Sequence, residues 1–320
     1  MTQLSKILVI GGTGFIGQAI VTRLAAQHHT VTVPSRRRRA GRELILLPTV
    51  DVVQADIHDD SVLQPMIAEA NAVINFVGIA HSDSGEPYGS EFKKIHVDLP
   101  RRIANACSLG KQRLIHFSAL GADPASDALP SEYLRSKADG EKAITQSDCK
   151  TWTILRPSVV FGPGDNFLNL FARIQRFAPF MAVGRAGAQL QPIFVGDVAS
   201  AVSNILDNTA TYGKHYELAG PEIYSLGELI QLAGRYSGHE RRLIKLSDSM
   251  GRLQARLMGA MPGPKLMTSD NFDSLAKPSV ATGPMAPELG INPRSLSVIA
   301  PQYLGNQVSP YNETRTRARR

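Results

Sequence analysis

A short apolar segment that ends in glycines constrains the fold of this chain more than any other feature. The run Lys6–Ile10 is apolar after its first residue, and glycines follow at positions 11, 14 and 17. Residues 18–27 then repeat apolar side chains at helical spacing, so the order predicts a strand, a tight turn and a helix. In such a turn Gly11 lets the backbone leave the strand, Gly14 lets it approach a pyrophosphate, and Gly17 lets the helix pack closely.

The turn predicts a dinucleotide site. The start of the helix offers N–H groups without intrahelical partners, and the positive end of the helix dipole, to phosphates. A glycine-rich turn without a ligand is the alternative, but its place between a strand and a helix near the N-terminus favours the site. The predicted contacts are Gly11, Thr13, Gly14, Phe15, Ile16 and Gly17.

Strands and helices alternate after this turn. Five further segments read as strands: 29–34, 49–55, 72–77, 113–117 and 151–155. Helical patterns stand between them at 60–70, 90–109 and 131–144. This alternation predicts an α/β fold, a Rossmann-type doubly wound parallel sheet. A content of 43% hydrophobic and 20% charged residues is that of a globular protein, and no apolar run is long enough to span a membrane.

The end of the second strand is basic. NAD-selective folds place an acidic residue here, which binds the ribose 2′-hydroxyl. This chain has Ser35, Arg36 and Arg37 instead, and such side chains suit a 2′-phosphate. We therefore predict NADP(H) in preference to NAD(H), with a solvated basic loop as the alternative.

The ends of the other strands supply the remaining predicted cofactor contacts. Asp56 follows the third strand, where it either touches the adenine amino group or caps the helix at 60–70. The other predicted contacts at strand ends are Ile57, Val77, Gly78 and Pro157.

Tyr133 and Lys137 are four residues apart on a predicted helix and so share one face. A lysine in this position can lower the pKa of the phenol and hold the nicotinamide ribose. Tyr133 is then the predicted proton donor or acceptor, and Lys137 both its partner and a cofactor contact.

The composition changes near Lys214. We predict an NADP(H)-binding domain at 1–213, a smaller mixed lid or docking region at 214–310, and a basic tail at 311–320. Residues 189–198 are expected to start a helix with Asp197 in its first turn, and helices are expected near 225–236 and 247–260. The net charge of +7 is concentrated at 36–39 and 315–320. The terminal arginines either contact an anionic surface or form a solvated tail.

No metal or disulfide site is expected. The two cysteines, Cys107 and Cys149, lack metal or disulfide spacing and are expected to be idle thiols in a reducing compartment. The first strand begins so early that we expect no signal peptide and a cytoplasmic location.

Three ordered motifs resemble the extended short-chain dehydrogenase/reductase superfamily. They are GGTGFIG at 11–17, Tyr133-x-x-x-Lys137 and RPSVVFGPGD at 156–165. Within it the chain is most similar to the atypical branch that contains the NADPH-binding accessory subunits of respiratory complex I. That closer resemblance rests on YLRSKADGEKAI at 133–144, FGPGDNFLN at 161–169, LMGAMPGPKLMTSDNFDSL at 257–275 and ELGINPRSLSVIAPQYL at 288–304.

One departure from the superfamily bears on catalysis. Active members carry a Ser or Thr one or two residues beyond the first Ser after the fifth strand, and its hydroxyl polarises the substrate carbonyl. Here the sequence is Ser118-Ala119-Leu120-Gly121, so the hydroxyl expected at 119 or 120 is missing. Ser118 is the alternative donor, although the resemblance places a structural serine at its position. Lys137 still has a role in a protein that only binds NADPH, because it binds the ribose.

The resemblance leaves two functions open. The first is a non-catalytic accessory or assembly subunit that holds NADP(H) as a structural ligand, with Tyr133 and Lys137 vestigial as catalytic residues. The second is an NAD(P)-dependent reductase, dehydrogenase or epimerase that acts on an unknown substrate, such as a quinone-related molecule.

The first reading implies complex I subunits as partners, no nucleic acid and no transmembrane segment. It also implies a peripheral place on the inner, cytoplasmic face of the energy-transducing membrane, with the basic C-terminus as a membrane contact.

Overall fold

The computed structural model describes residues 5–126, 128–260 and 267–305. Its centre is a seven-stranded sheet in the order β11-β6-β5-β4-β1-β2-β3, in which every neighbouring pair is parallel. The strands are β1 (Lys6–Ile10), β2 (Thr30–Ser35), β3 (Val50–Gln54), β4 (Ala72–Asn75), β5 (Arg113–Phe117), β6 (Trp152–Pro157) and β11 (Lys214–Leu218). The predicted doubly wound parallel sheet is confirmed.

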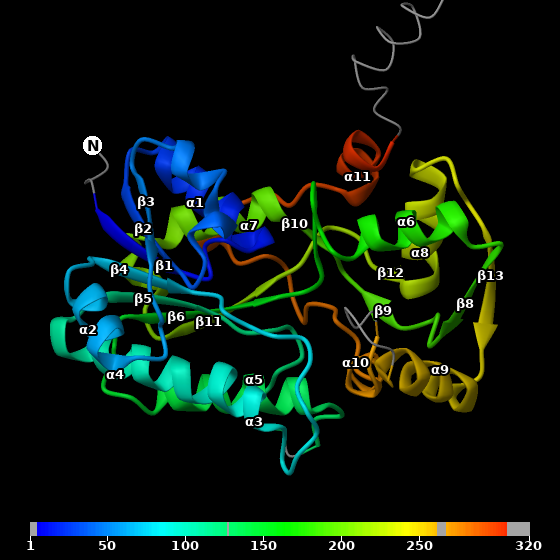
Figure 1. Ribbon diagram of the computed structural model, residues 1–320, viewed down its shortest axis with the longest axis horizontal. Coiled ribbons are helices and arrows are strands. Elements are labelled where there is room, and N and C mark those ends of the chain that lie inside the picture. The colour runs from blue at the N-terminus through cyan, green and yellow to red at the C-terminus, as the bar shows by residue number, and fades with distance from the viewer. Residues whose placement is uncertain (1–4, 127, 261–266, 306–320) are drawn as a thin grey trace, which may run out of the picture.

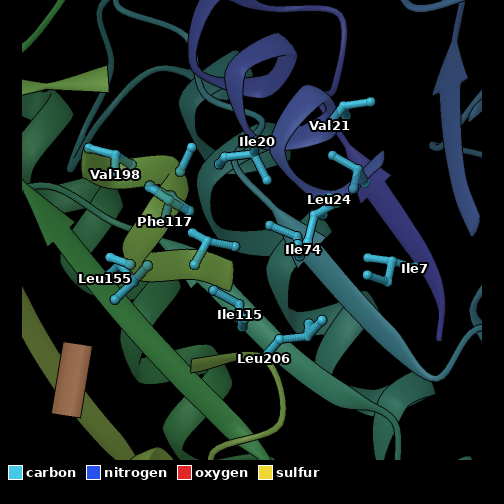
Figure 2. Close-up of a cluster of buried hydrophobic side chains, with 14 of the residues drawn as sticks. Ile7, Ile20, Val21, Leu24, Ile74, Ile115, Phe117, Leu155, Val198 and Leu206 are labelled. Atoms are coloured by element: carbon cyan, nitrogen blue, oxygen red, sulfur yellow. The ribbon is translucent and has the colours of Figure 1, made fainter. Parts of the chain in front are cut away.

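Helices cover both faces of this sheet (Figure 1). One face carries α1 (Phe15–Ala26) and α7 (Val195–Ile205), whose apolar side chains meet those of β1, β4 and β5 in a buried cluster (Figure 2). The other face carries α2 (Asp60–Ala68), α4 (Leu99–Gly110) and α5 (Glu132–Thr145). Both faces of the central strands are therefore buried, which explains their nearly continuous apolar sequences.

The long helix predicted at 90–109 is interrupted. It consists of α3 (Ser90–Phe92), a π-helical segment η3 (Lys93–Asp98) and α4. Pro100 lies in the first turn of α4 and has no N–H to donate to the carbonyl of His96. That carbonyl oxygen instead lies against Gly140 of α5, where a Cβ would be 2.0 Å away. The proline and the close contact account for the π-helical segment η3, whose turn is wider than that of an α-helix.

A second, smaller part packs beside the carboxyl ends of the strands (Figure 1). Its apolar core joins residues from 161–190, 226–233 and 296–304. Its helices are α6 (Leu168–Phe177), α8 (Leu226–Tyr236), α9 (Asp248–Ala260), α10 (Ser269–Ser274) and α11 (Leu296–Leu304). Its strands are β7 (Val160–Phe161), β8 (Phe180–Gly184), β9 (Gln189–Leu190), β10 (Ile193–Phe194), β12 (Tyr224–Ser225) and β13 (Arg242–Leu246).

The two parts do not divide at residue 213. Strand β11 belongs to the predicted second part by sequence, yet it pairs with β6 at the edge of the main sheet. Conversely, α6 and β8 precede residue 213 but pack in the core of the smaller part. The predicted tail at 311–320 lies outside the described residues.

The segment 189–198 leads into a helix, as expected. Two short strands, β9 and β10, occupy its start, and α7 begins at Val195. Asp197 does lie in the first turn, where its carboxylate accepts hydrogen bonds from Arg294 N at 2.7 Å and Nε at 2.8 Å.

Short 3-10 turns connect several of these elements: η1 (Arg38–Gly41), η2 (Leu44–Leu46), η4 (Thr209–Thr211) and η5 (Pro287–Leu289). Cys107 and Cys149 are free and buried. Among the described residues, no helix is both long and apolar enough to cross a membrane.

Candidate nucleotide-binding site

The glycine turn lies where the strand order reverses, between β1 and β4. Helices connect β1 to β2 on one side and β4 to β5 on the other, and parallel sheets bind ligands at such a point. Gly11 has φ +91°, and a Cβ on it would lie 3.2 Å from the main-chain nitrogen of Val77. The turn after β1 therefore contacts the segment after β4, which brings Gly11 and Val77 together.

Gly17 is required by packing. A Cβ there would lie 2.4 Å from the carbonyl oxygen of Gly11 and 2.6 Å from the ring of Phe76. Gly12, which sequence reasoning did not single out, is equally constrained, since its Cβ would lie 2.8 Å from Val33.

Gly14 differs from these glycines in a way that points to a ligand. It is exposed, and a Cβ on it would meet only the carbonyl oxygen of Gly11, at an ordinary 3.4 Å. Its φ of −79° suits any residue. The protein's own packing therefore does not demand a glycine here, whereas the close approach of a pyrophosphate would.

The start of α1 also fits a phosphate. Gly14 is the N-cap residue, and no side chain caps the helix. The first N–H groups, at Phe15, Ile16 and Gly17, thus face the turn at the positive end of the helix dipole. Thr13 lies beside them and accepts a hydrogen bond on its carbonyl oxygen from Gln18 Nε2 at 2.9 Å.

The basic segment after β2 is exposed. The Ser35 hydroxyl donates to the carbonyl oxygen of Arg37 at 3.0 Å, and this bond folds the chain just after the strand. The side chains of Arg36 and Arg37 are exposed, with no hydrogen bond or ion pair within the part of the chain described. Both guanidinium groups are available to an anionic ligand.

The ends of β2 and β3 come together around His58. Burial, followed by the charge of Lys94, lowers the pKa of His58, and the charges of Arg102 and Arg36 act in the same direction. The charge of Asp56 opposes this change. Asp56 itself is exposed and accepts a hydrogen bond from His58 N at 2.9 Å, while Ile57 is half-buried. Asp59, and not Asp56, caps α2 by accepting from Ser61 N, so the capping alternative for Asp56 is wrong.

Lys137 lies at the inner end of the site. It is 4% exposed, and its Nζ donates to the carbonyl oxygen of Phe117, the last residue of β5, at 3.1 Å. The same Nζ would lie 3.2 Å from a Cβ on Gly78. Burial lowers the pKa of Lys137 to about 8, although the charge of Glu141 opposes this change. The ammonium group stays largely charged at neutral pH and lies beside Gly78, as a contact to ribose hydroxyls requires.

His96, which no sequence pattern indicated, holds the Gly78 segment in place. Its Nε2 accepts from Ile79 N at 3.0 Å, so Nδ1 carries the proton and donates to Ser136 Oγ at 2.8 Å. Ser136 Oγ in turn donates to the carbonyl oxygen of Tyr133 at 2.8 Å. Burial lowers the pKa of His96 to about 2, with the charge of Lys137 acting in the same direction. This neutral histidine links the loop after β4 to α5.

Tyr133 has apolar surroundings. Its ring packs against a cluster that includes Ala119 and Leu134, and it meets the ring of His96 edge-on with centroids 5.6 Å apart. Desolvation of the hydroxyl, followed by the charge of Asp270, raises the pKa of Tyr133 to about 12. Ala119 and Leu120 are both buried, at the positions where the superfamily places its hydroxyl donor.

Ser118 is buried near a charged pair. It is 4% exposed, and its hydroxyl makes no hydrogen bond with any described residue. The neighbouring Glu141 carboxylate pairs with Arg156. Burial of Glu141 acts to raise its pKa, but hydrogen bonds from His215 and Arg156 outweigh it, and the Glu141 pKa is lowered. The Ser118 hydroxyl therefore lies next to a buried ion pair without a hydrogen bond of its own.

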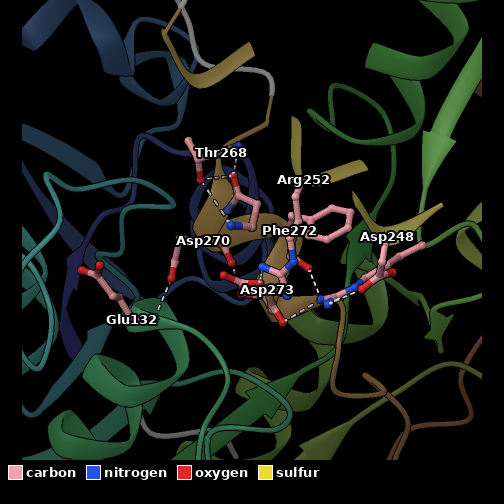
Figure 3. A network of polar contacts seen from close by, with 10 residues as sticks. Glu132, Asp248, Arg252, Thr268, Asp270, Phe272 and Asp273 are labelled. Atoms are coloured by element: carbon pink, nitrogen blue, oxygen red, sulfur yellow. Dashed lines mark hydrogen bonds and ion pairs between the residues drawn. The ribbon is translucent and has the colours of Figure 1, made fainter. Parts of the chain in front are cut away.

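A residue of the smaller part caps the N-terminus of α5 (Figure 3). The Asp270 carboxylate, on α10, accepts from Glu132 N at 2.6 Å and from Tyr133 N at 3.2 Å. A capping box between Thr268 and Asn271 starts α10 and orients Asp270. The helix that carries Tyr133 and Lys137 is thereby fixed from both parts of the chain.

The predicted residues fall into three groups within one region. The glycine turn, Val77 and Gly78 line the switch point, Lys137 lies beside Gly78, and Ser35, Arg36, Arg37, Asp56 and Ile57 surround the ends of β2 and β3. Pro157 ends β6 and accepts on its carbonyl oxygen from Leu120 N at 2.9 Å. No group of three or more potential metal ligands occurs among residues 5–126, 128–260 and 267–305.

Comparisons with known proteins agree with this geometry. A family model described as the NAD dependent epimerase/dehydratase family matches residues 7–220. The NADH dehydrogenase [ubiquinone] 1 alpha subcomplex subunit 9 of Dictyostelium discoideum is 34% identical over 228 residues, which cover 70% of this chain and 62% of that protein. The subunit of the same name from Rattus norvegicus is 30% identical over 299 residues, covering 91% of this chain and 77% of that protein. Both relatives are described as mitochondrial.

A solved structure shares the fold. The UDP-glucose 4-epimerase of Thermus thermophilus, in complex with NAD, superimposes with a TM-score of 0.61 and 20% identity. The match covers 85% of this chain and 99% of that one. The matched segment spans 62% of the length of the Dictyostelium relative.

Proposed function

Because the chain belongs to the NAD dependent epimerase/dehydratase family, we propose that it binds NADP(H) as a structural ligand and serves as a non-catalytic accessory or assembly subunit of respiratory complex I. The nucleotide would lie across the switch point, with its pyrophosphate against Gly14 and the N-terminus of α1. Lys137 would hold the nicotinamide ribose. When bound, the nicotinamide can donate or accept a hydride, but the residues around it favour retention over turnover.

The choice of NADP(H) rests on the charges at the end of β2. Arg36 and Arg37 are exposed and have no acidic partner in the described structure, and the positions after Ser35 hold no carboxylate. A 2′-phosphate offers each guanidinium a charge-assisted, bidentate partner, which a 2′-hydroxyl does not.

One observation carries the non-catalytic role: the position of the missing hydroxyl is apolar and buried, and Tyr133 packs beside it. Ala119 and Leu120 offer no donor to a substrate carbonyl. A lysine close to a reactive phenol should lower its pKa. Here the pKa of Tyr133 is raised, so the phenol is a poor base at neutral pH.

The relatives support complex I as the partner. Two curated relatives from distant organisms carry the same subunit name and match most of this chain. We extend this to a peripheral location on the inner, cytoplasmic face of an energy-transducing membrane, close to the ubiquinone-reducing enzyme. The basic C-terminus, outside the described residues, is the proposed membrane contact.

Co-purification tests the partner. The chain is tagged at its native locus, membranes are solubilised in mild detergent, and the other complex I subunits recovered with it are quantified. Near-stoichiometric recovery is expected. Recovery of the chain from the soluble fraction, without those subunits, would contradict the proposal.

Retention of the nucleotide tests the structural role. The purified chain should keep NADPH through dialysis, and carbonyl compounds should not oxidise it. The bound nucleotide should also raise the melting temperature by mass action. Easy loss of the nucleotide would count against a structural ligand.

An NAD(P)-dependent oxidoreductase or epimerase is the second candidate. The specific observation in its favour is the pair Tyr133 and Lys137, both intact on α5. In that case Tyr133→Phe should abolish turnover and leave NADPH affinity nearly unchanged, whereas a non-catalytic protein should show no turnover before or after the substitution.

A further inference from the structure

The smaller part encloses a large cavity beside the candidate nucleotide site. Its volume is about 1250 Å³, and it lies between α6, β8, α8 and α9. Typical pockets for drug-sized ligands are smaller, roughly 300–1,000 Å³. One end of the cavity is formed by Ala80 and His81, two residues beyond Gly78 of the nucleotide site. The side chain of Asn271, which also lines it, donates to the carbonyl oxygen of Ala80 at 3.2 Å.

Most of the wall is apolar. Helix α6 presents Leu170, Ile174 and the aromatic pair Phe167 and Phe171 to the cavity, at the spacing of one helix face. Elements from every other side add aliphatic and thioether side chains: Met181, Val183, Leu226, Ile230, Met258 and Met267. Methionine side chains are flexible, so such a wall can adapt to an irregular chain.

A polar stripe runs along the same helix next to the apolar one. It consists of Asn169 and Arg173, one turn apart, with Asn166 just before the helix. The Asn169 Nδ2 is buried without a hydrogen-bond partner in the described structure, and so is Nδ1 of His81 across the cavity. Arg173 is exposed and forms no ion pair with any described residue. A buried amide without a partner is costly, so Asn169 Nδ2 calls for an acceptor from a ligand.

The neighbouring carboxylate does not fill this role. Both oxygens of Asp165 are engaged by Phe167 N, Asn169 N, Gly162 N and the Tyr303 hydroxyl. Asn169 Nδ2 and Arg173 therefore remain as donors at the edge of an otherwise apolar space.

We propose that this cavity binds one long-chain fatty acid, with its hydrocarbon chain along the apolar walls and its carboxylate at Asn169 and Arg173. A sugar or nucleotide would need polar partners along its whole length, whereas most of the residues that line this cavity are apolar. The proposal does not depend on which nucleotide the chain binds or on its association with complex I.

Fluorescence titration with cis-parinaric acid tests the proposal on the full chain. The probe should bind saturably with one site per chain, and unlabelled hexadecanoate should displace it. Among decanoate, dodecanoate and tetradecanoate, affinity should rise about fourfold per methylene, the gain from burying one methylene group. Hexadecylamine, which has the same chain but a cationic head, should compete poorly.

Two variants locate the site. Ile174→Trp puts a large ring into the cavity wall and should weaken probe binding about tenfold or more, because less of the chain can be buried. Arg173→Gln should weaken binding of the acid and remove its advantage over the amine. Arg176→Gln is the matched control, since Arg176 is an equally exposed arginine on α6 that does not line the cavity.

Each variant is checked for folding by its melting temperature. Arg173→Gln changes an exposed side chain, so its result stands even if Ile174→Trp fails to fold. Non-saturable binding, equal affinity for the acid and the amine, or equal effects of Arg173→Gln and Arg176→Gln would each overturn the proposal. Loss of NADPH binding or of complex I association would not bear on it.

Discussion

Asp270 accepts a hydrogen bond from the main-chain nitrogen of Tyr133 at 3.2 Å, across 137 residues of sequence. The same carboxylate accepts from Glu132 N, and Ser131 Oγ accepts from Leu134 N. The N-terminus of α5 thus has one local cap and one cap supplied by α10. The position of Tyr133 is consequently set by the smaller part as well as by its own helix.

Asp270→Ala should lower the free energy of unfolding by about 1–2 kcal/mol, because two N–H groups at the start of α5 lose their acceptor. Denaturant titration measures the change. Asp273→Ala is the control: Asp273 lies on the same short helix and pairs with the half-exposed Arg252, an interaction of about 0–1 kcal/mol. Equal losses in the two variants would show that the cap on α5 contributes nothing specific.

Stability should fall as the pH drops below about 6.5, the range in which an unfolded histidine takes up a proton. Burial keeps His96 and His116 neutral in the folded protein, since it lowers the pKa of each well below 6.5. The unfolded state therefore binds more protons, and each such histidine contributes a slope of about 1.4 kcal/mol per pH unit.

The variant His96→Gln removes one of these groups. Between about pH 6 and pH 5, the slope of the unfolding free energy should decrease by about 1.4 kcal/mol per pH unit. Urea titrations across this range give the slope for both proteins. An unchanged slope would mean that His96 is protonated in the folded state, against its contacts with Ile79 and Ser136.

Gly14→Ala should mainly affect nucleotide binding, whereas Gly17→Ala should mainly affect the stability of the fold. At Gly14 the added methyl meets one carbonyl oxygen at 3.4 Å, so stability should change by less than about 1 kcal/mol while nucleotide binding is lost. At Gly17 the methyl would overlap Gly11 and Phe76, so the protein should be destabilised by several times as much. Melting temperatures and NADPH titrations separate the two outcomes. If Gly14→Ala bound NADPH normally, the pyrophosphate would not lie at this turn.

Arg36→Asp should weaken NADPH binding by about 10–100-fold and improve NADH binding, because a 2′-phosphate loses a charged partner and a 2′-hydroxyl gains an acceptor. Isothermal titration with both nucleotides provides the measurement. Arg39→Asp makes the same change of charge three residues later and should have a smaller effect. Similar losses of NADPH affinity for the two substitutions would indicate that the arginines act through a general positive potential and not through a local contact.

The sheet could be predicted because its signals are local. Strands β1 and β4 are nearly continuous apolar runs, and β2 alternates apolar and polar residues. The glycine turn after β1 fixes the start of α1. Strand β11 (Lys214–Leu218) is half-polar and follows the position at which we placed the domain boundary, so its sequence did not assign it to the main sheet; it joins the sheet through its pairing with β6.

The site was harder to predict where it depends on distant contacts. The positions of Gly11, Gly17 and Lys137 follow from spacing, since each acts within one turn or one helix. His96 and Asp270 act on α5 and on the loop after β4, and nothing in their own neighbourhoods indicates this. One distant contact did have a local signal, which concerns another residue. Asn75 is polar in a buried strand and therefore needs hydrogen-bond partners, which are the His116 ring and Val77 N.

The chain passes between its two parts several times. After β6 it enters the smaller part, returns to the sheet through α7 and β11, and leaves it again at β12. Neither part is therefore a continuous length of polypeptide, and a cut between residues 213 and 214 would leave each fragment with an incomplete core. Such interleaving favours a single cooperative folding transition. Unfolding of the smaller part would then also destabilise the main sheet that positions the glycine turn.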